Sequence, residues 1–167
     1  MDATALRAIQ APLKQKYRDN PDTSRITSCA EVALDPAQIA AFLPTHAPRI
    51  AGLHPATGGT GAQACSGDML LEALAACAGV TLMAVATSMG AKLTGGRIVA
   101  EGVWDARGTL GVDKTALVGI QNITLTFVLE GDLDEPTRQR LVQLTDRYCV
   151  ILATLHDPPK LSVAISA

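Results

Sequence analysis

The sequence predicts an α+β fold in one domain of residues 1–167, with a helical arm over residues 1–24. Two observations favour this class. Apolar residues make up 48% of the 167 residues and charged residues 18%, which is enough apolar surface for a core without disulfides. The segments with helical and strand patterns do not alternate strictly along the chain, as a doubly wound parallel sheet would require.

The N-terminal part begins with a helical pattern and ends in a loop. A helix is expected over residues 3–17, although Pro12 would kink or split it. A strand over residues 25–34 follows and ends at a turn, Asp35-Pro36, after which residues 37–43 fit no single pattern. Residues 44–61 contain three prolines and four glycines, which predicts a long irregular loop.

The centre of the chain predicts one long buried helix over residues 66–88. The Ser66 hydroxyl is expected to cap its first amides, and Gly90 is expected to end it. Beyond the first turn Glu72 is its only charge, and a helix that is apolar nearly all round is normally buried. The uncharged stretch 73–91 is long enough for a membrane span, but its many Ala, Gly, Thr and Ser residues favour a core helix.

The C-terminal half predicts strands over residues 97–105 and 120–130. The second alternates apolar and polar residues, which is typical of an antiparallel sheet with one solvated face. Asp134-Glu135-Pro136 is expected to begin one long helix, whose apolar stripe extends to Leu155. A closing strand is expected over residues 161–165.

Composition excludes several functions. A net charge of -2 and only five aromatic residues argue against nucleic acid or an anionic membrane as a partner. The first residues lack a secretory signal pattern, so a reducing, cytoplasmic location is expected, where the four cysteines would be free or redox-active.

No motif for a metal, a phosphate or a serine nucleophile is recognisable. The three histidines are far apart and the cysteines lack zinc-ligand spacing, so no metal is expected. The glycines of residues 54–61 precede a helix without forming a P-loop or a dinucleotide fingerprint, and no cofactor is expected. A flexible connection is favoured there over phosphate binding.

From the pattern alone, Cys77 and Cys149 are more typical of small core residues than of reactive thiols, since each lies on an apolar helical face. Cys77 is predicted in mid-helix, away from the N-terminal end of the dipole. A thiolate there would need a cation from another segment, and Arg49 in the proline-rich loop is a candidate.

Two segments resemble the OsmC/Ohr family of osmotically inducible and organic hydroperoxide resistance proteins. They are GDMLLEALAACAGVTL, residues 67–82, and RYCVILATL, residues 147–155. The resemblance extends over about residues 25–166. It implies an α+β fold with antiparallel sheets packed around a buried central helix, and two chains intertwined into a homodimer.

The resemblance also implies a chemistry, the reduction of organic hydroperoxides by a cysteine pair that a dithiol of the lipoyl type then recharges. Cys77 matches the peroxidatic residue, which becomes a sulfenic acid, and Cys149 matches the resolving residue. Arg49 is the best match to the arginine that stabilises the thiolate in this family.

The chain departs from the family pattern at three places. The glutamate expected ten residues before the first cysteine is replaced by Gly67, so that either Asp68 takes its role or the arginine is held otherwise. The proline expected after the second cysteine is Val150. Cys65 belongs to an extended loop and is interpreted as an incidental thiol rather than a third redox partner.

Two other functions remain open. The same dimer could be a small-ligand-binding or redox-sensing module, in which case the cysteines would be ordinary buried thiols with raised pKa values. A weaker alternative is a protein that binds phosphate or an acyl carrier through the 54–61 loop, which predicts anion binding near Ser66.

Overall fold

The structure is a computed structural model that describes residues 3–35, 40–42 and 51–165. Its helices in chain order are α1 (Ala3–Asp19), the 3-10 turns η1 (Pro21–Ser24) and η2 (Pro55–Thr57), α2 (Ser66–Met89), α3 (Ala106–Thr109), α4 (Glu135–Tyr148) and α5 (Val150–His156). Its strands are β1 (Arg25–Asp35), β2 (Ala40–Phe42), β3 (Ala51–Gly52), β4 (Ala64–Cys65), β5 (Lys92–Asp105) and β6 (Gln121–Asp132).

The main sheet has the strand order β2-β1-β5-β6, and all its neighbouring strands are antiparallel. Ile26 pairs with Trp104 between β1 and β5, and Ile98 pairs with Phe127 between β5 and β6. The short strands β3 and β4 form a separate parallel pair. The predicted α+β class is confirmed, and β5 begins five residues earlier than its apolar pattern indicated.

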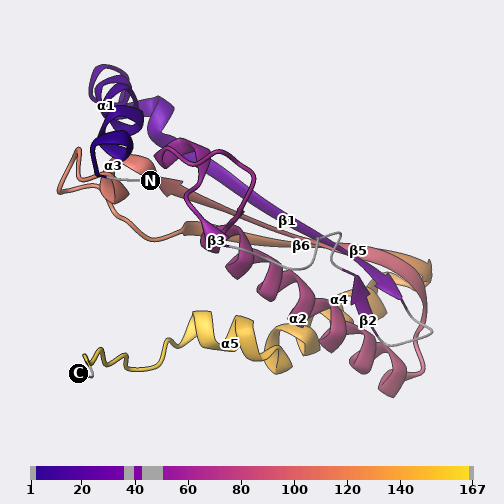
Figure 1. Cartoon of the computed structure of the whole chain (residues 1–167). Coiled ribbons are helices and arrows are strands. Elements are labelled where there is room, and N and C mark those ends of the chain that lie inside the picture. Colours follow the sequence, from indigo (N-terminus) through magenta and orange to yellow (C-terminus); the bar gives the residue numbers. More distant parts are fainter. Residues whose placement is uncertain (1–2, 36–39, 43–50, 166–167) are drawn as a thin grey trace.

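Helix α2 lies along one face of this sheet, and α4 and α5 pack against α2 (Figure 1). The centre of the core therefore consists of small and aliphatic side chains of α2: Leu71, Leu74, Ala75, Ala78, Leu82, Met83 and Ala86. Gly90 ends the helix in the left-handed conformation (φ 63°), as predicted. The N-cap is Cys65 without a side-chain cap, so the expected cap at Ser66 is wrong, because Ser66 is already helical.

The single C-terminal helix expected from residue 134 is in fact two helices. Cys149 interrupts it with an extended backbone (φ -72°, ψ 113°) and is both the C-cap of α4 and the N-cap of α5. The apolar stripe runs through both helices, which is why periodicity alone did not reveal the break.

The closing strand expected over residues 161–165 is not formed. This segment is extended away from the rest of the chain (Figure 1), and Leu161, Val163 and Ile165 are 89%, 96% and 98% exposed. A strand needs a neighbouring strand to satisfy its backbone hydrogen bonds, and no strand of the described residues pairs with this segment.

The N-terminal helix α1 continues through Pro12 without splitting. It closes a second, smaller core in which Tyr17 packs with Trp104, Ala106 and Leu110. Two side chains of α1 also hold the loop around η2: the Tyr17 hydroxyl donates to the Ala56 carbonyl at 2.9 Å, and the Gln10 amide donates to the Thr57 carbonyl at 3.0 Å. The 44–61 region thus contains two short ordered elements, β3 and η2, and is less irregular than predicted.

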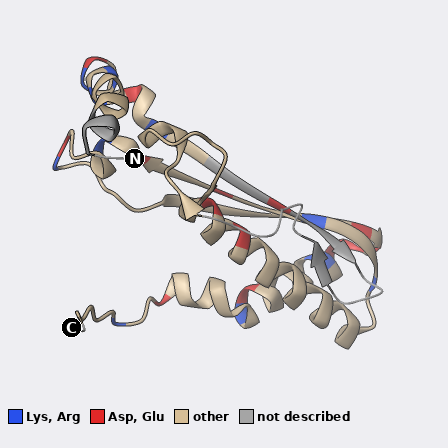
Figure 2. Ribbon diagram, viewed as in Figure 1, with Lys and Arg blue, Asp and Glu red and all other residues tan. Residues whose placement is uncertain are grey.

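Charged side chains are unevenly distributed (Figure 2). Helix α2 carries Asp68 and Glu72 near its start and no other Asp, Glu, Lys or Arg, and α5 carries none. Helix α2 is long and apolar enough to cross a membrane, but its packing against the sheet is that of a core helix.

Candidate active site

Cys77 lies in the middle of α2 and faces the junction between α4 and α5. Its side chain is half-buried and packs against the main core, alongside Ile151 and Leu152 of α5. The site is positioned there because the alanine-rich surface of α2 lets the C-terminal helices approach closely.

Cys149 is fully buried beside Cys77. Its backbone is shared by two helices: its N–H donates to the Thr145 carbonyl, and its carbonyl accepts from the Ala153 N–H, both at 2.9 Å. Within the described residues, Cys65, Cys77 and Cys149 all carry free thiols. The structure therefore brings together the two predicted redox cysteines, which are 72 residues apart in the chain.

Hydrogen bonds favour the thiolate form of Cys77. Burial raises the pKa of this thiol, but hydrogen bonds from the Ile151 N–H, the Cys149 thiol, the Val150 N–H and the Thr81 hydroxyl outweigh burial, and the pKa lies below its ordinary value. The break at Cys149 is what turns the backbone N–H groups of Val150 and Ile151 toward α2.

The pKa of Cys149 is shifted in the opposite direction. Burial raises the pKa of Cys149. The neighbouring Cys77 raises it further, because the Cys149 thiol donates a hydrogen bond to the Cys77 sulfur and because a Cys77 thiolate would repel a second thiolate at Cys149. The pair is thus polarised, with Cys77 as the acidic member and Cys149 as the protonated donor.

The charged residues predicted for the site are not brought to Cys77 by the described structure. Arg49 lies outside the described residues. Asp68 is half-buried in the first turn of α2, nine residues before Cys77, which is about 13 Å along a helix axis. Asp68 is therefore too far along the helix to contact the Cys77 thiol directly.

Cys65 and the 54–61 loop form a separate region at the start of α2. A cavity of about 230 Å³ lies there, with His54, Cys65 and Trp104 in its lining, and the His54 and Trp104 rings meet edge to face at 5.1 Å. The polar groups of the loop hydrogen-bond to one another. The Gly59 N–H donates to the His54 carbonyl at 3.0 Å, and the Thr60 hydroxyl accepts from the Ala62 N–H at 3.2 Å. These bonds support a structural role for the loop rather than phosphate binding.

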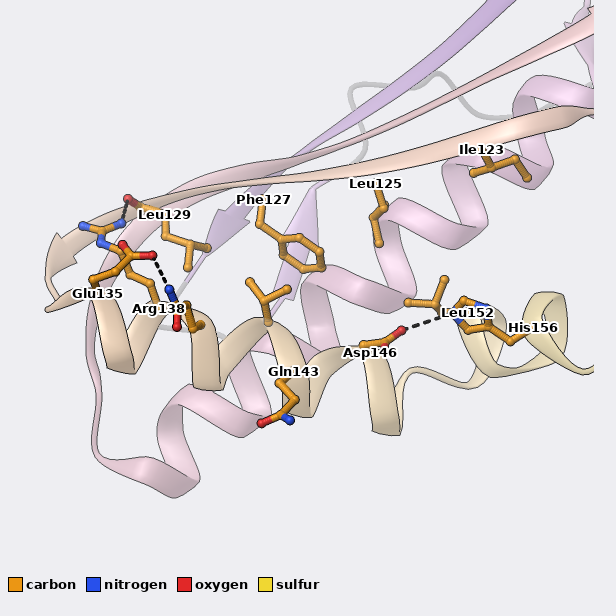
Figure 3. A pocket seen from close by; sticks show the side chains of 12 residues that line it. Ile123, Leu125, Phe127, Leu129, Glu135, Arg138, Gln143, Asp146, Leu152 and His156 are labelled. Carbon is orange, nitrogen blue, oxygen red and sulfur yellow. Dashed lines mark hydrogen bonds and ion pairs between the residues drawn. The ribbon is translucent and has the colours of Figure 1, made fainter.

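A groove with a volume of about 710 Å³ lies between β6 and the helices α4 and α5 (Figure 3). Its floor is apolar and consists of alternate residues of β6, and its rim is polar, with Arg138 and the Asp146–His156 pair at 3.2 Å (Figure 3). None of its lining residues is a cysteine. The thiol chemistry, rather than the size of a groove, therefore locates the candidate site at Cys77.

Two contributors to the site were not recognised from the sequence. They are the Thr81 hydroxyl and the backbone amides of Val150 and Ile151. Thr81 had a signal, because a residue four positions after Cys77 lies one turn further along the same helix face. The backbone amides of Val150 and Ile151 had no sequence signal, since no side chain indicates which way a backbone N–H points. Across the described segments, no three His, Cys, Asp or Glu residues gather as a metal site would require.

Comparisons with known proteins agree with this architecture. Residues 59–164 match the model of the OsmC-like protein family. The fold matches a solved OsmC-like hydroperoxide resistance protein from Jannaschia sp. CCS1, with a TM-score of 0.62, over 86% of this chain and 95% of that chain. The two sequences are 12% identical, so this likeness shows the fold alone. No curated protein matches the chain.

Proposed function

This chain belongs to the OsmC-like protein family, and from that premise we propose that it is a thiol-dependent peroxidase that reduces organic hydroperoxides. One observation carries the proposal: the free thiols of Cys77 and Cys149 lie side by side where α2 meets the start of α5, and hydrogen bonds there lower the pKa of Cys77 despite its burial. Two thiols that served only as packing would both be raised in pKa by burial.

The reaction proceeds in two steps. The Cys77 thiolate attacks one oxygen of the peroxide, the O–O bond breaks, and the alkoxide takes up a proton and leaves as an alcohol. Sulfur loses two electrons and becomes a sulfenic acid. The Cys149 thiol then attacks this sulfur, the S–S bond forms, and the hydroxyl group leaves with the thiol proton as water. A dithiol reductant, for which a lipoyl group is the expected type, restores both thiols by exchange.

Uncharged groups supply the hydrogen bonds described for Cys77, all from α2 and from residues 149–151. We propose that Arg49 adds a cation to this set and that Asp68 orients the arginine. Arg49→Gln and Asp68→Asn test these roles, and each is expected to slow disulfide formation more than Lys92→Gln, which removes an exposed charge from β5.

We further propose that the protein is a homodimer. The exposed apolar residues 161, 163 and 165 alternate as in a strand, and Leu70 and Val80 of the central helix are about 40% exposed. A second copy would cover both surfaces. A monomer in size-exclusion chromatography with light scattering, at the concentration of the enzyme assay, would contradict this.

The peroxidase proposal is tested by adding cumene hydroperoxide, and separately hydrogen peroxide, to the reduced protein and counting thiols by intact mass. A Cys77–Cys149 disulfide is expected, forming faster with the organic peroxide. Cys77→Ser is expected to abolish it, and Cys65→Ser, which removes a half-buried thiol elsewhere, is expected to leave it unchanged. Survival of all thiols in excess peroxide would refute the proposal and leave the ligand-binding alternative.

A further inference from the structure

We propose that the cavity at the start of α2 is a second ligand site, which binds a small neutral aromatic molecule such as a benzene ring with a short substituent. The cavity is separate from the redox pair. Cys65 in its lining precedes Cys77 by 12 residues, which is about 18 Å along a helix axis. The proposal therefore stands whether or not the chain reduces peroxides.

The size of the cavity fits a ligand of this kind. Its volume is about 230 Å³, whereas protein interiors contain few voids larger than a water molecule. An apolar cavity of about 150 Å³ is enough to bind benzene. Gly67 helps to keep the space open, because a Cβ there would lie only 3.6 Å from Ile120 and 3.7 Å from the Cys65 sulfur, which both line the cavity. Leu53 in the lining is 45% exposed, so the cavity is reached from solvent.

The lining indicates a neutral ligand. Among the described residues that form it, none is Asp, Glu, Lys or Arg. The His54 ring accepts the Ala56 N–H at Nδ1, at 3.0 Å, so this nitrogen is unprotonated and the ring is neutral. Asp68 in the first turn of α2 already complements the positive end of that helix. A charged ligand would therefore lose its hydration without gaining an opposite charge.

Two side chains of the lining favour an aromatic ligand over an aliphatic one. The His54 and Trp104 rings meet at 90° with their centroids 5.1 Å apart, and aromatic rings gain more from such neighbours than the area they bury accounts for. Both rings are held in place before a ligand arrives. The Ala56 hydrogen bond fixes His54, and Trp104 is 7% exposed and packs in the same small core as Tyr17. Such preorganisation lowers the entropic cost of binding.

The test is a titration of the reduced protein with benzyl alcohol, followed by two independent readouts. Trp104 is the only tryptophan of the chain, so its fluorescence, excited where benzyl alcohol does not absorb, reports on the cavity. The rate of alkylation of Cys65 by iodoacetamide is measured by peptide mass spectrometry. We expect both to change saturably with the same midpoint, and alkylation of Cys65 to slow by about fivefold, because a bound ligand covers most of such a cavity. Alkylation of Cys77 should not change.

Two further probes test the chemical class of the ligand. Cyclohexylmethanol has the size of benzyl alcohol without its aromatic ring, and its midpoint is expected to be about tenfold higher. Benzoate has the ring with a negative charge, and it is expected to give no saturable change. Equal midpoints for the two alcohols overturn the aromatic assignment, and tight binding of benzoate overturns the neutral one.

A variant that fills the cavity tests its location. Gly67→Leu directs a side chain between Ile120 and Cys65 and is expected to abolish both benzyl alcohol responses. Gly119→Leu is the matched control, because it adds the same side chain to an exposed glycine with open space around it, outside the lining. Gly67→Ala replaces Gly67→Leu if the latter does not melt cooperatively, and is expected to raise the midpoint. Absence of saturation in the wild type, an unchanged midpoint in the Gly67 variants, or protection of Cys77 instead of Cys65 overturns the proposal.

Discussion

Replacing Val150 by proline isolates the contribution of one backbone amide to the reactivity of Cys77. Proline removes the N–H that donates to the sulfur and changes little else. Position 150 is the first residue of α5, where proline is well tolerated, and Cys149 already has the extended backbone that a residue before proline requires. The Val150 side chain is 69% exposed, so little packing is lost.

The expected effect is an increase in the pKa of Cys77. A hydrogen bond to an ionised group contributes about 1.5 kcal/mol at the low end, which applies because the Ile151, Thr81 and Cys149 donors remain. A tenfold change in ionisation corresponds to about 1.4 kcal/mol. Val150→Pro is therefore expected to lower the thiolate fraction, and with it the alkylation rate of Cys77 below its pKa, by about tenfold.

The assay is the rate of iodoacetamide modification of Cys77 across a pH series, compared with Val150→Ala. The alanine variant loses the same side chain but keeps the N–H, so its curve should coincide with that of wild type. If proline and alanine give the same curve, the backbone amide does not stabilise the thiolate and the reasoning is refuted.

Three further predictions concern stability. Asp105→Asn is expected to cost about 1 kcal/mol of unfolding free energy at pH 7. Hydrogen bonds from Arg107 lower the pKa of Asp105 to about 2, so this stabilisation is present above its ordinary pKa of 3.8 and disappears as the pH falls through about 2. Urea unfolding of the wild type and of Asp105→Asn, at pH 7 and at about pH 2, checks this. Gly59→Ala would place a methyl group against the Leu53 carbonyl, and a loss of more than about 2 kcal/mol is expected in thermal melts. Tyr17→Phe removes the hydrogen bond of the arm to the η2 loop and is expected to cost about 1 kcal/mol, and an unchanged urea midpoint would contradict that role.

The fold was largely predictable because its strongest signals are local. The alternation of apolar and polar residues correctly predicted strand β6, and the apolar composition of residues 66–88 correctly predicted the buried helix α2. Gly90 ends α2 because it adopts a positive φ there. The strand expected over residues 161–165 was wrong for a non-local reason. Its alternation is real, but a strand forms only where another backbone is available to pair with it.

The candidate site was predictable only in part. The two cysteines were assigned through a family resemblance, since their apolar helical positions alone are typical of core residues. The break at Cys149 was missed because neither proline nor glycine marks it, and the amides of Val150 and Ile151 were missed with it. Backbone groups carry no sequence signature, so their contribution emerges only from the packing of α5 against α2.

The junction between α4 and α5 is a single residue long, and this has a consequence for tolerated changes of chain length. Each residue added to a helix rotates everything that follows by about 100°. One insertion or deletion beside Cys149 would turn the resolving thiol and the two amides away from Cys77 together. Natural variation in length should therefore be absent at this junction and concentrate instead in the exposed residues 117–119 of the connection before β6.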